Sequence, residues 1–321
     1  MSDYGVVFSD ARGVNVDTYL KKYVIDVVKA KSGTSKRYPN APDLEAVMYS
    51  ALGVYSGSAT VSGDTVSWPS STQLGTPWTD NDVIIVTAGR GVVASNDYDS
   101  VIVDSGGKPL FPYSPSTYVF YKRLQLPVGH GKTLNIGITT SEPTPLVFFG
   151  GDTFTVKDVS PGNWNSDNTA IGAMFRTDIS GNQHRIFCHF ESGVVFAYIF
   201  MPSSYVWAKT ASADRPDYGA VSFNDRGEIQ FISGQTPLEF IKTSTENMTA
   251  PKEMGFKCAF LGTITGHFPV ISGLGGFYRV SVSNVGKGTQ HQPCTITTGM
   301  SQSPVNGRYP YTYCTNRTRY E

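Results

Sequence analysis

A short stretch that begins with Tyr and ends with Gly occurs three times in the chain, as Tyr4–Gly13, Tyr98–Gly107 and Tyr218–Gly227. The copies align without gaps, with Asp directly before the Tyr and Val at the fourth position of each. Aromatic and β-branched residues that run into Asn, Asp or Ser and then Gly are typical of a strand entering a tight turn, because Gly accepts a positive φ at little cost. The repeat therefore predicts a chain built from recurring β-hairpins.

Length and composition agree with this prediction. A chain of 321 residues can bury a large core and has room for two or three domains. Only 16% of its residues are charged, against about 25% in ordinary soluble proteins. We expect an all-β protein of tandem small β-sandwich or barrel-like domains with antiparallel hairpins. One copy of the repeat opens each expected domain, and the domains span residues 1–95, 96–214 and 215–321.

Apolar runs between turn signals predict the individual strands. The expected strands are 19–29, 83–86, 116–124, 133–138, 146–149, 239–242, 256–261 and 276–283. The continuous apolar run at 83–86 is expected to lie in the middle of a sheet. The segment 44–51 is ambiguous, because its apolar residues fit a short helix after Pro42-Asp43 and fit a strand equally well.

Glycines between these strands predict the turns. Gly63-Asp64 separates two short Thr-Val-Ser strands and is a two-residue loop of the kind that favours primed turns. The segment 171–200 is interpreted as a meander whose turns, at 180–182 and 191–193, bring neighbouring strands into antiparallel pairs.

One glycine-rich segment resembles the end of a phosphate-binding loop. It reads Gly129-His-Gly-Lys-Thr133, but Leu126 occupies the position of the first Gly, and a strand-like pattern follows where a helix is needed. We therefore interpret 129–131 as the tip of a hairpin.

Two pairs of carboxylates are candidates for catalysis, because glycan hydrolysis needs two carboxyl groups across a cleft. Asp80 and Asp82 lie on one expected loop, and Asp152 and Asp158 lie around one expected strand. Solvated loop carboxylates are the expected role of all four. The chain has no Gly-x-Ser-x-Gly turn, so serine-hydrolase chemistry has no support.

Histidines and cysteines predict no metal centre. His184 and His189 lie five positions apart on an expected strand and therefore point to opposite faces. The four cysteines have no Cys-x-x-Cys spacing, and Cys294 and Cys314 are expected to remain unpaired. No cofactor is predicted.

Charge and hydropathy limit the partners. The formal net charge is zero, so no bulk attraction to nucleic acid or to an anionic membrane is implied. No segment is long and apolar enough to span a bilayer, and Met1-Ser-Asp-Tyr4 lacks the features of a signal peptide. We expect synthesis in the cytosol.

The C-terminal segment from Ser301 is rich in Tyr, Pro, Arg and Thr and has little apolar patterning. Tyr and Arg are common in protein–protein contacts, so this tail is expected to wrap an adjacent subunit. The candidate interaction residues are Tyr309, Tyr311, Tyr313, Arg317, Arg319 and Tyr320.

The stretch 218–238 follows the pattern Tyr-Gly-x-x-x-Phe-Asn-x-x-Gly-x-x-x-Phe-x-Ser and continues into Thr236-Pro-Leu238. It resembles a family of virion proteins of unassigned activity, found with the tail and tail-fibre proteins of tailed bacteriophages. Tyr4–Gly13 looks like the opening of the same family. Val103–Phe111 is similar, although that copy lacks the Gly after its Tyr. The resemblance implies a β-rich, tail-associated component of the virion, with no catalytic residues to carry over.

We therefore expect a non-enzymatic structural protein, made in the host cytoplasm and located in the virion. Its expected partners are further copies of itself, as a homo-oligomer, and other virion proteins. Attachment to the host is an additional expected role. The alternatives are a module that binds a carbohydrate receptor on the host surface through Trp and Tyr, and an enzyme that degrades such glycans.

Overall fold

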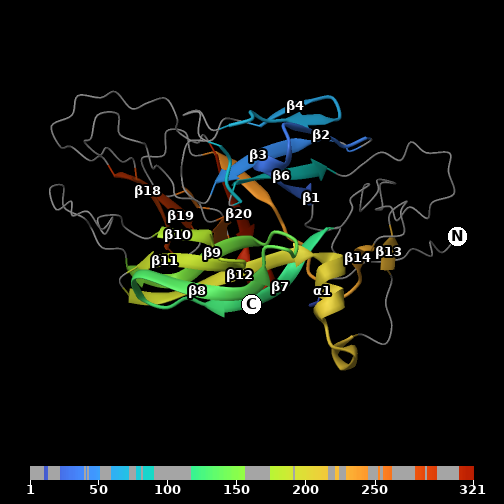
Figure 1. Ribbon diagram of the computed structural model, residues 1–321. Helices are drawn as coiled ribbons and strands as arrows, with labels where there is room; N and C mark the ends of the chain where they lie inside the picture. The colour runs from blue at the N-terminus through green and yellow to red at the C-terminus, as the bar shows by residue number, and fades with distance from the viewer. Residues whose placement is uncertain are drawn as a thin grey trace, which may run out of the picture.

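The computed structural model describes residues 11–13, 22–39, 41, 43–50, 59–71, 77–80, 82–89, 117–155, 174–190, 192–215, 221–223, 229–244, 252–253, 256–261, 279–285, 288–294 and 311–321. Antiparallel strands dominate these residues, which confirms the all-β class (Figure 1). Their one α-helix is α1 (Ser203–Lys209). None of the helices in this part of the chain is long and apolar enough to cross a membrane.

The largest sheet joins residues that are far apart in the sequence. Its six strands follow the order β15 (Ile241–Ser244), β20 (Tyr311–Asn316), β17 (Cys258–Leu261), β9 (Leu146–Thr155), β12 (Ser192–Pro202) and β7 (Tyr118–Gln125). Three strands come from the range 96–214 and three from the range 215–321. Because β17 pairs directly with β9, a boundary near residue 215 would cut through this sheet.

A second sheet has the order β10 (Met174–Ser180), β11 (Gln183–Phe190) and β8 (Gly129–Thr139). The turn predicted after Ser180 is confirmed, since Ser180 pairs with Gln183 and Gly181 has a φ of +60°. Gly accepts this left-handed conformation without the steric cost that a Cβ would bring.

The hairpin tip predicted at 129–131 is wrong, because these residues open β8. β7 and β8 do not pair with each other; they belong to different sheets. Between them the chain crosses from one sheet to the other through Leu126, whose N–H donates to the carbonyl of Val195 at 2.8 Å. The strand pattern expected at 133–138 is confirmed within β8.

The meander is confirmed for β10 and β11 and is wrong for its third strand. β12 pairs with β9 and β7 and not with β11. Val195, Ala197 and Ile199 on one face of β12 are buried, and so are Tyr198 and Phe200 on the other. A strand that is apolar on both faces is most stable where both faces are covered, and the middle of the large sheet provides that cover.

A third sheet has the order β1 (Lys22–Lys29), β6 (Asp82–Gly89) and β3 (Glu45–Ser50). The prediction that 83–86 lies in the middle of a sheet is confirmed, and every residue of β6 is buried. The ambiguous segment 44–51 is a strand over 45–50. Met48 and Tyr49 are adjacent residues of this strand and are buried in two different cores. This is expected of a strand, because its side chains point alternately to opposite faces.

A small sheet of β2 (Ser35–Arg37), β5 (Thr65–Ser67) and β4 (Thr60–Ser62) lies beside the third sheet. The predicted two-residue turn is confirmed, because Ser62 pairs with Thr65 and Gly63 has a φ of +59°. The indole N–H of buried Trp68 donates to the carbonyl of Ala30 at 2.9 Å, which anchors the small sheet to the end of β1.

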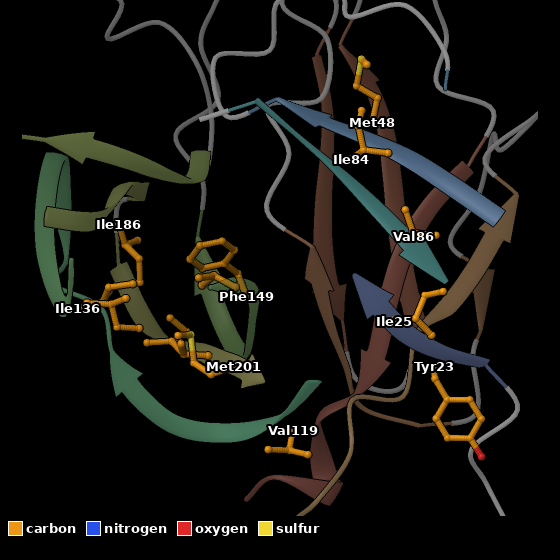
Figure 2. Packing of buried hydrophobic residues seen from close by; sticks show 14 of the residues in the cluster. Tyr23, Ile25, Met48, Ile84, Val86, Val119, Ile136, Phe149, Ile186 and Met201 are labelled. Carbon is orange, nitrogen blue, oxygen red and sulfur yellow. The ribbon is translucent and has the colours of Figure 1, made fainter. Parts of the chain in front are cut away.

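Strand alternation separates two cores on the two faces of the large sheet. Val147 and Phe149 face a core shared with Ile136 of β8 and Ile186 of β11, so the large sheet and the β10–β11–β8 sheet form a sandwich (Figure 2). Phe148, with Leu146 and Phe200, faces a core shared with strands of the third sheet, which contributes Val24, Val83 and Ile85. The third sheet also contributes Ile25, Met48 and Ile84 to the first core, so it takes part in both cores.

The remaining strands form two small sheets. One contains β16 (Lys252–Glu253), β19 (Gly288–Cys294) and β18 (Arg279–Val285), and the other contains β13 (Val221–Phe223) and β14 (Ile229–Ile232). The antiparallel pair β13–β14 confirms the third predicted hairpin, and Gly13 has the positive φ expected of the first, at +75°. The second copy of the repeat and Gly227 lie outside the described residues.

Candidate interaction surface

The C-terminal segment predicted as an interaction tail is built into the large sheet. β20 lies between β15 and β17 and pairs with both, and a 3-10 turn, η4 (Arg317–Arg319), follows it. Residues 311–321 are therefore ordered parts of their own chain, and a contact of this segment with a neighbouring subunit stays a prediction. Tyr and Thr favour strands, and backbone pairing on both sides holds β20 although it has few aliphatic residues.

The three tyrosines at the start of this segment have different positions. Tyr313 is half-buried and stacks on Phe240, with ring centroids 4.9 Å apart. The backbone of Tyr311 pairs with Ser244 in β15. Tyr309 lies outside the described residues. Of these three, Tyr313 is thus engaged within its own chain.

Arg317 is buried, with 1% of its side chain exposed. Its guanidinium donates from Nη1 to Glu321 Oε1 at 2.8 Å, and the hydroxyl of Tyr198 donates to the same oxygen at 2.9 Å. Burial raises the pKa of Tyr198. Gly150 makes room for this side chain, since a Cβ at that position would lie 3.0 Å from Arg317 Cδ and 2.7 Å from the carbonyl oxygen of Cys258.

Tyr320 is buried among aromatic rings of the large sheet. Its ring meets that of Phe200 edge-on at 4.8 Å and that of Phe120 at 5.5 Å. Its hydroxyl donates to the carbonyl of Pro237 at 3.1 Å and accepts the backbone N–H of Glu239 at 3.0 Å. Burial raises the pKa of this phenol. Tyr320 therefore closes the core and does not present a binding face.

Arg319 completes the intramolecular contacts of the tail. Its Nε donates to Glu239 Oε2 at 2.7 Å, between side chains that are 18% and 15% exposed. Burial raises the pKa of Glu239, and the charge of Arg319 acts in the opposite direction. The first repeat turn also reaches this end of the chain, since Arg12 Nη1 donates to the carbonyl of Thr318 at 3.0 Å. The turn and the tail thus support each other.

The third repeat hairpin carries two exposed apolar side chains on one strand. Val221 and Phe223 occupy the same face of β13 and are 39% and 57% exposed. The paired strand β14 is different, because Phe231 and Ile232 are buried. In Figure 1 this hairpin lies beside α1, away from the stacked sheets. Among the described residues, β14 is the only strand that pairs with β13, so β13 is an edge strand in this part of the structure.

A group of aromatic rings with cations over them lies beside this hairpin. Tyr205 of α1 meets Tyr121 of β7 edge-on at 5.7 Å. Lys209 Nζ lies 5.3 Å from the centre of the Tyr205 ring, and Arg215 Cζ lies 4.5 Å from that of Trp207. These three rings are half-buried. Sequence patterns missed α1, because a helix of seven residues is too short for a clear apolar period.

The acidic residues considered for catalysis have separate surroundings. Asp80 pairs with Lys31, and Asp82 is buried and accepts the backbone N–H of Thr79 at 2.7 Å. The side chains of Asp152 and Asp158 lie outside the described residues. The described part of the chain contains no group of three or more His, Cys, Asp and Glu that could hold a metal ion. Cys314 is buried.

Comparison with protein-family models, with curated proteins and with solved structures finds no match to this chain.

Proposed function

We propose that this protein is a non-enzymatic structural component of a bacteriophage virion, associated with the tail, which assembles with further copies of itself and with other virion proteins. Two features support the proposal. The first is the resemblance of the segment 218–238 to virion proteins of tailed phages. The second is that the same segment forms a hairpin with an exposed apolar strand.

The edge position of β13 among the described strands is the observation that carries the proposal. An edge strand presents unpaired N–H and carbonyl groups, and proteins that remain monomeric commonly protect such edges with charges or Pro. β13 reads Val-Ser-Phe and contains neither. Strand addition at such an edge combines backbone hydrogen bonds with the burial of alternate side chains, here Val221 and Phe223.

A second copy of the same strand is the partner that β13 fits. Two β13 strands in antiparallel register around Ser222 would place Val221 of each copy opposite Phe223 of the other. Such a contact is two-fold symmetric and brings no like charges together. The zero net charge of the chain adds no long-range repulsion between copies.

A three-residue edge makes few hydrogen bonds, so one contact alone is weak. Repeated contacts in a particle raise the effective concentration and convert weak pairing into stable assembly. We therefore expect self-association that depends strongly on protein concentration.

Two lysine substitutions test the assembly step, one at the β13 edge and one at a control position. Phe223→Lys introduces a charge at the β13 edge and is expected to shift self-association, followed by analytical ultracentrifugation, to at least about tenfold higher concentration. Val61→Lys is the matched control, because Val61 is 38% exposed on β4, another edge strand. Equal behaviour of the two variants, or a monomeric parent protein at all concentrations, would contradict assembly through β13.

The location in the virion needs a separate test. Antibodies raised against the purified protein are expected to label one position on gradient-purified particles of the phage that encodes it, in negative-stain micrographs. Protein found only in the infected-cell lysate, and absent from the particles, would overturn the virion assignment whatever the result of the ultracentrifugation.

Recognition of a host carbohydrate is a second candidate function, favoured by the half-buried rings of Tyr121, Tyr205 and Trp207. Aromatic faces beside polar groups are common in sugar sites. A glycan array is expected to report micromolar binding that Trp207→Ala abolishes. Binding that survives this substitution would exclude Trp207 from the site.

A further inference from the structure

A buried histidine lies at the corner where the sandwich meets the third sheet. On β11, Ile186 and Cys188 face the sandwich core, and His184 continues this inward face at the end of the strand. His184 pairs with Ile138 of β8 and Ile179 of β10, and it is only 3% exposed. Strand alternation therefore places an imidazole where an apolar side chain would fit.

The third sheet and its flanking loop bring charges to this corner. Lys29, at the end of β1, donates from Nζ to the carbonyl of Thr140 at 3.3 Å, which joins the two layers. The same ammonium lies 3.9 Å from Asp80, and Asp80 also pairs with Lys31. The positive charge of Lys29, which acts on His184, thus belongs to the contact that joins the two layers.

Glu142, which follows β8, supplies the other acid near the imidazole. Its carboxylate accepts the backbone N–H of Thr139 at 2.7 Å, the ammonium of Lys209 at 2.9 Å and the hydroxyl of Tyr205 at 3.0 Å. These hydrogen bonds lower the pKa of Glu142 to about 2, and the bond from the backbone of Thr139 has the largest effect. Both acids near His184 are therefore already engaged by other donors.

The imidazole itself lacks a partner on one side. Among the described residues, no group forms a hydrogen bond with Nε2 of His184, although the atom is buried. An unbonded nitrogen is tolerated in the neutral ring, whereas the protonated ring needs an acceptor for each N–H. Burial, helped by the charge of Lys29, lowers the pKa of His184, while Glu142 and Asp80 act in the opposite direction. Arg185 and its partner Asp178 lie on the opposite face of the sheet.

We propose that His184 makes this corner acid-sensitive: when its imidazole takes a proton from water, the third sheet separates from the sandwich at the contact between Lys29 and Thr140. The proton creates a second cation near Lys29 and a buried N–H at Nε2, an atom that no group among the described residues bonds. Opening the corner lets water solvate the imidazolium. This device is independent of the proposed virion function.

The linkage between proton binding at His184 and the closed state of the corner sets the direction in which stability changes with pH. The unfolded or opened chain binds a proton at the imidazole near about pH 6.5, and the closed state binds it only at lower pH. The closed state is therefore destabilised as the pH falls below about 6.5. Glu142 and Asp80 have lowered pKa values, so the stability that these carboxylates contribute is lost only in a more acidic range. A pH titration can therefore separate protonation of His184 from protonation of Glu142 and Asp80.

Hydrogen exchange of the intact protein tests the proposal. After correction for intrinsic exchange rates, the opening equilibrium constant of β1 and of the end of β8 is expected to rise by about an order of magnitude between about pH 7 and pH 5 in the parent protein. In His184→Leu it is expected to stay constant over this range. Thr87→Val is the matched control, because Thr87 is a buried polar residue whose Oγ1 also has no partner among the described residues but does not titrate. An unchanged pH dependence in His184→Leu would overturn the proposal.

A second measurement covers the case in which His184→Leu does not fold. The imidazole of His184 in the parent protein is expected to titrate, by NMR, below the value of about 6.5 typical of free histidine. Titration at or above that value would equally overturn the proposal.

Discussion

The C-terminal segment and the third repeat hairpin show how differently two similar short strands are used. β20 contains Tyr and Thr and lies between two strands of the large sheet. β13 contains Val, Ser and Phe and has one partner in the described structure. The more polar strand, β20, is therefore an inner strand of a sheet, whereas the more apolar strand, β13, has exposed side chains. Composition alone does not rank strands by burial, because neighbours on both sides decide it.

The largest expected effect concerns the space that the C-terminal segment needs. Gly150→Val places side-chain atoms against the carbonyl of Cys258 and the side chain of Arg317. It is expected to destabilise the protein by about 3 kcal/mol or more, measured by urea unfolding. Gly33→Val is the control, since the nearest atom to a Cβ there is a backbone oxygen 4.0 Å away. Similar losses in both variants would show that β9 and the tail are not tightly packed.

A smaller effect is expected at Arg317. Arg317→Met keeps most of the apolar stem and removes the bond to Glu321. The expected loss of unfolding free energy is about 2 kcal/mol, because Glu321 is partly exposed and water replaces the lost donor. Arg12→Met is the comparison, since the guanidinium of Arg12 donates to Thr318 at an exposed position. An equal loss of unfolding free energy in Arg12→Met would contradict the difference expected between the buried and the exposed arginine.

The smallest effect is expected on the hairpin edge. Phe223→Ala should change the unfolding free energy by no more than about 0.5 kcal/mol, because the ring is 57% exposed. Phe231→Ala, on the paired strand, should cost about 3 kcal/mol, because that ring is fully buried. Calorimetric scans of the two variants measure this difference within one hairpin. A large loss for Phe223→Ala in dilute, monomeric protein would mean that its ring packs within the chain.

Several elements could be predicted from the sequence because their signals are local. Gly63-Asp64 between two Thr-Val-Ser runs specifies a hairpin without reference to the rest of the chain. The apolar run within β6 specifies a strand that is covered on both faces. The roles of His184 and Gly150 could not be predicted, because each depends on residues brought from distant strands.

The sequence by itself determined that most of the apolar segments are strands, where several tight turns lie and which strands carry apolar residues on both faces, because side-chain alternation and turn chemistry are properties of neighbouring residues. Only the tertiary structure decided which strands pair. β9 joins β12 and β17, β8 leaves β7 for another sheet, and the tail becomes an inner strand. Backbone hydrogen bonds are nearly identical for all strands, so the choice among partners depends on how well distant side chains fill the two cores.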